Sequence, residues 1–223
     1  MKPIQTTTFL VIFVILVFLE TVIANLEGFD TLHFISKPLI LSALITYFWL
    51  TTKRTNNRLK QLTLMALFFS LVGDVLLLFV FKSEFFFIGG LLAFLVAHIL
   101  YCLLFLNQRN SSLKPYGVIV LFAIYAIGLF AMLYPGLGDL LIPVIVYMLV
   151  IILMGVTAYL RKENVSSLSF KLVFIGALLF MLSDSILALN KYYTPIPYSS
   201  FSIMLSYALA QLLIVLGIKK QLE

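Results

Sequence analysis

Residues 179–189 read LFMLSDSILAL, and residues 68–79 read FFSLVGDVLLLF. Both stretches are apolar except for serines and one carboxylate each, Asp184 in the first and Asp74 in the second. Long apolar runs are typical of membrane-spanning helices, in which a charged side chain costs several kcal/mol unless its surroundings compensate for it. The same costly feature occurs twice in one chain, so we expect the two carboxylates to have a function.

The composition predicts an integral membrane protein. The chain has 223 residues, of which 63% are hydrophobic and 11% charged, whereas soluble domains have about 45–50% apolar and about 25% charged residues. The single cysteine, Cys102, excludes an intrachain disulfide. Lys2 and the apolar run that follows it resemble a signal peptide. Because the sequence begins at Met1, we interpret the run as a retained first span.

Apolar segments of about 20 residues, the length that crosses a bilayer as a helix, occur eight times. None shows the alternating pattern of a barrel strand. We therefore predict an all-α integral membrane fold in which residues 1–223 form a single polytopic domain. The expected spans are about 7–25, 31–50, 62–81, 85–106, 115–134, 139–160, 168–189 and 198–218.

The basic residues predict the orientation of these spans, because cytoplasmic loops are enriched in Lys and Arg. With the N-terminus inside, the outer side has only Lys82 and Lys191, and Lys37 lies within the second span. Both termini are then expected to be cytoplasmic. The other twelve basic residues fall on the inner side: Lys2, Lys53, Arg54, Arg58, Lys60, Arg109, Lys114, Arg161, Lys162, Lys171, Lys219 and Lys220.

The two Asp segments fall in the third and seventh spans, which run in the same direction. This spacing permits a parallel internal repeat of two four-helix halves. Each Asp follows a small residue, Gly73 or Ser183, and precedes a Leu-rich turn. Small residues let neighbouring helices approach closely and leave room for a substrate beside a carboxylate.

Asp74 and Asp184 are the strongest catalytic candidates. Each lies about 6–8 residues from the expected outer end of its span, or roughly 10 Å deep at about 1.5 Å per residue. Equal depth would let both carboxylates share one cavity. Two carboxylates close together in a low dielectric cannot both ionise easily, so one would keep its proton. The alternative is that both are polar helix-packing residues, for which Asn or Ser would be less costly.

Further polar side chains lie in the spans and are candidates for binding or support. Glu20 and Lys37 are nearly symmetric about the first turn, which allows either a structural ion pair or a site beside the kink expected at Pro38. His98 and Tyr101 are three residues apart and share a helix face. The remaining candidates, each of which could equally serve in ordinary helix packing, are Ser70, Ser183, Tyr207 and Gln211.

Several kinds of chemistry are disfavoured by the sequence. Two histidines cannot form a three-histidine zinc site. His33 and His98 lie at different depths, which disfavours a site of two histidines and a carboxylate. There is no GxSxG motif and no phosphate-binding Walker loop. We therefore expect no metal and no cofactor. We also expect no nucleic-acid partner, because the basic residues cluster in short loops between apolar runs, as residues that determine topology do. A homo-oligomer is allowed but not indicated.

The motifs of the chain together resemble those of the YhhN-like membrane proteins, which include the lysoplasmalogenases. They occur in the family's order from the second to the eighth span. The motifs are FISKPLI (34–40), FFSLVGDVLLL (68–78), GGLLAFLVAHILY (89–101), GALLFMLSDSILAL (176–189) and YALAQLLI (207–214).

This resemblance implies an eight-span fold and hydrolysis of the vinyl-ether bond of lysoplasmalogens. The products would be a fatty aldehyde and glycerophosphoethanolamine or glycerophosphocholine. Lys37 matches the family's Lys-Pro-Leu lysine, and Asp74 and Asp184 match its Gly-Asp and Ser-Asp aspartates. His98 and Tyr101 match its His-x-x-Tyr pair.

The residues and the resemblance support one chemical hypothesis. A vinyl ether is hydrolysed by protonation of its β-carbon, and the resulting oxocarbenium ion takes up water. One Asp would donate the proton, and the other would stabilise the cation and activate water, as in glycoside hydrolysis. Lys37 would bind the lipid phosphate or tune the pair.

Two other functions are open at this stage, a small proton-coupled transporter and a lipid-binding protein without catalysis. The expected substrate is a lysolipid among bilayer lipids. The expected location is the bacterial cytoplasmic, or inner, membrane.

Overall fold

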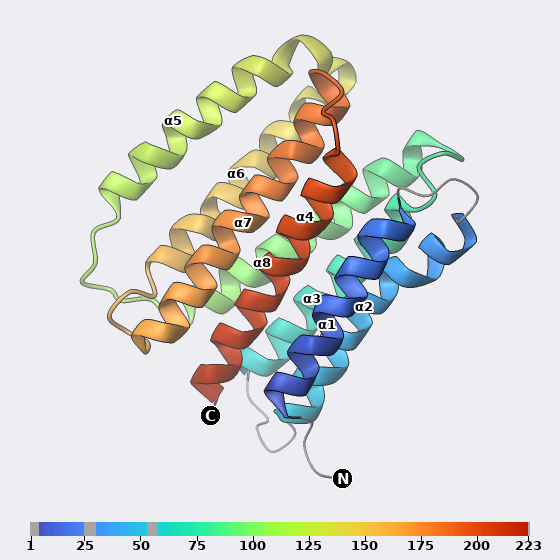
Figure 1. Cartoon of the computed structure of the whole chain (residues 1–223). Coiled ribbons are helices and arrows are strands. Elements are labelled where there is room, and N and C mark those ends of the chain that lie inside the picture. Colours follow the sequence, from blue (N-terminus) through green and yellow to red (C-terminus); the bar gives the residue numbers. More distant parts are fainter. Residues whose placement is uncertain (1–4, 25–29, 53–57, 223) are drawn as a thin grey trace. The chain divides into compact units, whose positions relative to one another are not determined.

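The computed structural model of the chain describes residues 5–24, 30–52 and 58–222. Within these residues eight helices are long and apolar enough to cross a membrane, and no strand occurs, which confirms the prediction of an all-α fold of membrane-spanning character (Figure 1). Lys2, Lys53 and Arg54, which contribute to the predicted orientation, lie outside the described residues. The helices are α1 (Thr6–Ile23), α2 (Asp30–Thr51), α3 (Arg58–Leu77), α4 (Glu84–Leu106), α5 (Tyr116–Leu133), α6 (Leu141–Tyr159), α7 (Ser167–Tyr192) and α8 (Ser199–Leu222).

Helix α3 differs most from its expected bounds, because it begins at Arg58 and ends at Leu77. The residues after it form turns in which Phe79 donates its backbone N–H to Leu76 and Lys82 donates to Phe79. The Phe79 ring packs against Phe34 of α2, with ring centroids 5.3 Å apart. Apolar side chains thus continue past the helix end, so hydropathy alone could not locate that end.

The chain divides into two compact units. The first contains residues 1–101 with the last two residues of the chain, and the second contains residues 102–221. The first unit therefore holds α1 to α3 and most of α4, and the second holds α5 to α8. The predicted single domain and parallel repeat remain predictions, and each unit is described by itself below.

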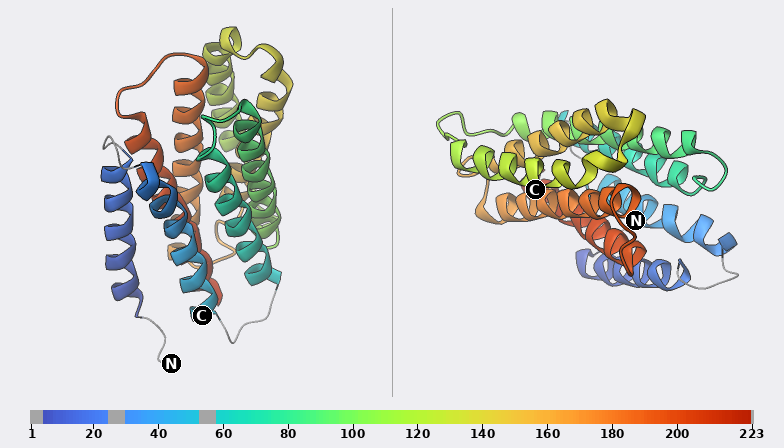
Figure 2. Two further views of the ribbon diagram at one scale, coloured as in Figure 1. Left: turned by 90° about the vertical axis from the view of Figure 1, so that its right-hand side faces the viewer. Right: turned by 90° about the horizontal axis from the view of Figure 1, so that it is seen from above.

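In the first unit α2 packs against both α1 and α3 (Figures 1 and 2). The ring of Phe9 on α1 stacks on Tyr47 of α2, with centroids 3.8 Å apart. The Tyr47 hydroxyl donates to Thr6 Oγ1 at 3.0 Å. Aromatic stacking and one shared hydrogen bond therefore fix the α1–α2 contact at the N-terminal end of α1.

In the second unit α7 packs against α5, α6 and α8. Glycine allows α7 and α8 to approach closely, since a Cβ at Gly176 of α7 would lie 2.9 Å from the Ala210 carbonyl oxygen of α8. Further along α8, the Ser169 hydroxyl donates to the Gly217 carbonyl oxygen at 2.7 Å. Small residues therefore hold the α7 and α8 backbones together, as in other tightly packed membrane helices.

Arg161 closes one end of the second unit and is completely buried just after α6. Its Nε donates to Gln108 Oε1 at 2.7 Å, and its Nη2 donates to Ser169 Oγ and Gln221 Oε1 at 2.9 Å each. The guanidinium also lies 5.6 Å from the centre of the Phe105 ring. Burial lowers the pKa of Arg161 to about 9, so the group is still charged at neutral pH. One cation thereby joins the ends of α4, α7 and α8.

Candidate functional site

The polar residues singled out from the sequence fall in both units. The first unit contains Glu20, Lys37, Ser70, Asp74, His98 and Tyr101, and the second contains Ser183, Asp184, Tyr207 and Gln211. The shared cavity of Asp74 and Asp184 therefore stays a prediction.

Asp74 lies on α3 next to a close contact with α4. A Cβ at the preceding residue, Gly73, would lie 2.7 Å from the Phe94 ring of α4. Asp74 is 2% exposed and Ser70, one turn earlier on the same helix face, is fully buried. Asp74 is three residues from the end of α3 rather than the expected six to eight, because α3 stops at Leu77. Glycine at position 73 thus leaves room for the Phe94 ring of α4 against α3, one residue from Asp74.

His98 and Tyr101 lie on α4 and are both completely buried. His98 is one turn beyond Phe94 and therefore continues the face of α4 that packs on Gly73. Because α3 and α4 pack together where Gly73 meets the Phe94 ring, His98 lies further along the same helix pair as Asp74. The first unit therefore gathers a carboxylate, an imidazole and a phenol along one helix pair.

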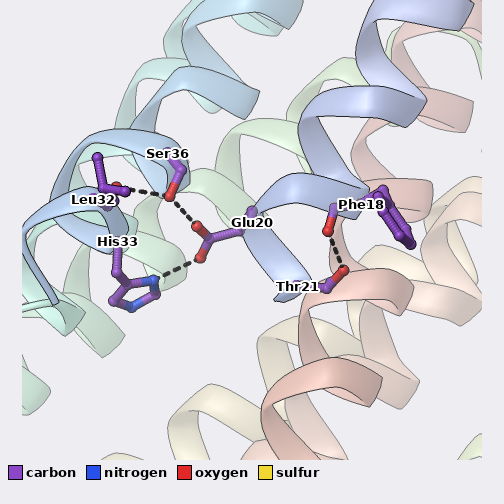
Figure 3. A network of polar contacts seen from close by, with 6 residues as sticks. All are labelled: Phe18, Glu20, Thr21, Leu32, His33 and Ser36. Carbon is purple, nitrogen blue, oxygen red and sulfur yellow. Dashed lines mark hydrogen bonds and ion pairs between the residues drawn. The ribbon is translucent and has the colours of Figure 1, made fainter. Parts of the chain in front are cut away.

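Glu20 joins α1 to α2 through a small network of polar contacts (Figure 3). Its Oε1 lies 2.8 Å from His33 Nδ1, and its Oε2 accepts a hydrogen bond from the Ser36 hydroxyl. Glu20 is 1% exposed, whereas the His33 side chain is 31% exposed. The ion pair with Lys37 that the sequence allowed is therefore wrong. The side chain of α2 that lies against Glu20 is His33, one helical turn before Lys37 on the same face.

Lys37 follows Ser36 directly on α2 and is half-buried. The helix continues through the next residue, Pro38, to Thr51. Lys37 thus lies beside the proline, and its role as a site residue stays a prediction.

Asp184 lies on α7 in the second unit and is held by a tyrosine of α6. The hydroxyl of Tyr147 donates to Asp184 Oδ2 at 2.6 Å. The hydroxyl of the preceding Ser183 points to another helix, because it donates to the Ile203 carbonyl oxygen of α8 at 3.1 Å. The second unit therefore presents Asp184 at the contact of α6 and α7.

Tyr207 and Gln211 lie one turn apart on α8 and are both buried. The Tyr207 ring meets Phe180 of α7 edge to face, with centroids 5.4 Å apart. Tyr207 therefore takes part in helix packing, which was one of the two roles that the sequence allowed for it. This contact does not test a further role in substrate binding.

Three partners of the candidate residues were missed by reasoning from the sequence, namely His33 and Ser36 beside Glu20 and Tyr147 beside Asp184. Tyr147 carried a usable signal, since it is a hydroxyl-bearing residue within the aliphatic run LIPVIVYMLVIIL of α6. A buried tyrosine hydroxyl normally has a hydrogen-bond partner. His33 and Ser36 lie in a less apolar helix and carried no comparable signal.

In the part of the chain that the structure describes, eight helices are long and apolar enough to cross a membrane, and several of them contain buried ionisable groups. These features define a class of all-helical membrane protein with polar groups inside its spans. Residues 32–218 match the model of the YhhN family. The chain therefore belongs to the YhhN family, and the resemblance seen in its motifs is confirmed.

Similar proteins include two curated lysoplasmalogenases, each matched over 158 residues. The chain is 35% identical to lysoplasmalogenase TMEM86A of Bos taurus, over 69% of this chain and 63% of that protein. It is 32% identical to lysoplasmalogenase TMEM86B of Homo sapiens, over 70% of this chain and 63% of that protein. The matched region thus spans less than two thirds of these relatives. No solved structure matches the chain significantly.

Proposed function

We propose that this chain is an intramembrane hydrolase that cleaves the vinyl-ether bond of lysoplasmalogens. The products are a fatty aldehyde and glycerophosphoethanolamine or glycerophosphocholine. The observation that carries the proposal is that Asp74 and Asp184 occur in apolar membrane-spanning helices of a chain whose relatives are named lysoplasmalogenases. Carboxylates at such positions are retained for function more often than for packing.

The proposed chemistry uses the two carboxylates as acid and base. A carboxylic acid protonates the β-carbon of the vinyl ether, and a carboxylate stabilises the oxocarbenium ion and accepts a proton from the attacking water. The two Asp side chains supply both groups, and the chemistry requires no metal or cofactor.

The remaining candidates act on the substrate in this scheme. Lys37 binds the lipid phosphate, since an ammonium on the outer half of α2 is suited to a phosphate oxygen. His98 and Tyr101, together with Ser70, Ser183, Tyr207, Gln211 and Glu20, shape or support the binding region. The enzyme works as a multi-pass protein of the bacterial inner membrane with both termini cytoplasmic, and its lysolipid substrate enters from the bilayer.

The experiment that tests this function compares two substrates with purified protein in detergent. Lysoplasmenylethanolamine should release fatty aldehyde, and its saturated ether analogue should release none. In heavy water the aldehyde should carry one deuterium on the carbon next to its carbonyl, because that carbon is the one protonated. A folded protein that releases no aldehyde from the vinyl ether would contradict the proposal.

A further inference from the structure

Two loops of the second unit are joined to each other by hydrogen bonds. The backbone N–H of Asn110, in the connection from α4 to α5, donates to the Leu160 carbonyl oxygen in the connection from α6 to α7, at 2.7 Å. The Asn110 side chain donates to the Lys162 carbonyl oxygen at 3.3 Å. Residues 107–115 and 160–171, which are far apart in the sequence, are therefore held side by side.

Arg161 lies at this junction and adds a positive charge that no acid beside it cancels. The guanidinium is completely buried, and it donates only to neutral groups, on Gln108, Ser169 and Gln221. A buried charge is screened by salt much less than an exposed one. Arg161 therefore both fixes the two loops and contributes to a positive potential around them.

The surface formed by the two loops is strongly basic. Residues 107–115 and 160–171 contain five basic residues and a single acidic one, Glu163. The Lys162 ammonium lies 3.8 Å from Glu163 Oε1, and both side chains are exposed, so this pair is weak. Four of the basic side chains are exposed or partly exposed, and we refer to them as the basic patch: Arg109, Lys114, Lys162 and Lys171. Apart from Lys162, the side chains of the patch form no hydrogen bond or ion pair with any described residue.

The basic patch adjoins the most exposed helix of the second unit. Tyr116 is exposed and begins α5 two residues after Lys114. Only 11% of the spanning segment of α5 is buried, compared with 33% to 61% for those of α6, α7 and α8. Cations, an exposed tyrosine and an apolar helix face thus follow one another along the chain. This order matches the headgroups and acyl chains of a bilayer.

We propose that the basic patch binds the headgroup phosphate of an anionic phospholipid whose acyl chains lie along α5. Ammonium and guanidinium groups both donate hydrogen bonds to phosphate oxygens. In the predicted orientation this end of the helices faces the cytoplasmic leaflet, where anionic lipids attract basic segments. The alternative is that the cations only determine topology, which requires charge but no particular lipid. The lipid site is separate from the proposed hydrolase activity, and its test needs no turnover.

Helix α7 offers a matched pair of variants. Lys171 belongs to the patch and lies near the start of α7, whereas Lys191 lies near its end, roughly 30 Å away at about 1.5 Å per residue. Both are exposed, so Lys171→Gln and Lys191→Gln remove the same charge from opposite ends of one helix. A patch variant, Arg109→Gln/Lys114→Gln/Lys171→Gln, removes the three patch cations that have no partner among the described residues.

The affinity for lipid is measured by native mass spectrometry of the purified protein in detergent, which resolves each bound lipid. Phosphatidylglycerol is the anionic probe, and phosphatidylethanolamine is the zwitterionic control. A basic residue near an anionic lipid surface contributes about fivefold in affinity. Lys171→Gln should therefore raise the Kd for phosphatidylglycerol about fivefold, and the patch variant should raise it about a hundredfold. Lys191→Gln should keep the wild-type Kd.

Thermal unfolding gives a second readout, because a lipid that binds the folded protein raises its Tm. Phosphatidylglycerol should raise the Tm of the wild type and of Lys191→Gln more than phosphatidylethanolamine does, and the rise should be much smaller in the patch variant. Equal Kd values for Lys171→Gln and Lys191→Gln would overturn the proposal and leave the patch with a role in topology only. Equal affinity of the wild type for the two lipids would also overturn it.

Discussion

The contact of α7 with α8 depends on a hydrogen atom at Gly176, so Gly176→Ala should destabilise the second unit. A Cβ there would lie 2.8 Å from Ile214 Cγ1, 2.9 Å from the Ala210 carbonyl oxygen and 3.1 Å from the Ile214 backbone nitrogen. The last two atoms belong to the α8 backbone, so no rotamer change can relieve the contact. The two helices would have to move apart.

The size of the effect follows from two opposing terms. Overpacking of a well-packed contact costs about 1–3 kcal/mol. Alanine is intrinsically favoured over glycine within a helix by about 0.8–1.0 kcal/mol, which offsets part of that cost. Because two of the three close atoms belong to the α8 backbone, the overpacking cost should lie in the upper half of its range. We therefore expect a net loss of about 1–2 kcal/mol, or roughly 2–8 °C in Tm for a chain of this size. The assay is thermal unfolding of the purified protein in one detergent.

Gly128→Ala is the matched control, because it makes the same change on α5, where a Cβ would have no atom within 4 Å. Helix propensity alone then applies, and Tm should stay the same or rise. A Tm for Gly176→Ala at or above that of the wild type would refute the reasoning from helix contact. Equal decreases in both variants would refute it as well.

Three further predictions concern other contacts. Arg161→Lys should lower the unfolding free energy by about 2–3 kcal/mol, because the ammonium of lysine cannot reproduce the forked hydrogen bonds that the guanidinium makes. An unchanged midpoint of unfolding in denaturant would contradict a stabilising role for Arg161. Gly73→Ala should displace the Phe94 ring beside the carboxylate of α3 and lower kcat/KM for aldehyde release, while retention of full activity would show that this contact is not required. Glu20→Gln should cost about 1 kcal/mol because it changes the carboxylate that contacts His33 and Ser36. The loss should be smaller in a His33→Ala background when both are measured by thermal unfolding.

The sequence predicted the helices because eight apolar runs of sufficient length can satisfy their backbone groups in a bilayer only as helices. It could not predict where α3 ends, since Phe79 and Phe81 are apolar although they lie in turns. Arg161 was taken as one of the basic loop residues, and nothing local indicated that residues as distant as Gln108 and Gln221 would bury it.

The candidate residues were found from the cost of placing polar groups in apolar spans, and their partners were not. Asp74 and Asp184 stand out against their neighbours in sequence. The hydrogen bond from Tyr147 to Asp184 joins residues 37 positions apart, and the pairing of Glu20 with His33 rather than Lys37 depends on which side chain reaches across the α1–α2 contact. Such choices are made by tertiary packing, which periodicity does not encode.

The most direct test of the account is aldehyde release from lysoplasmenylethanolamine by the wild type, Asp74→Asn and Asp184→Asn, each verified as folded by its Tm. These variants keep the shape of the side chain and remove its acid–base chemistry. The account predicts aldehyde from the wild type and a loss of at least about a hundredfold in each variant. Turnover at the wild-type rate in either variant would contradict the claim that the two membrane carboxylates carry out the reaction.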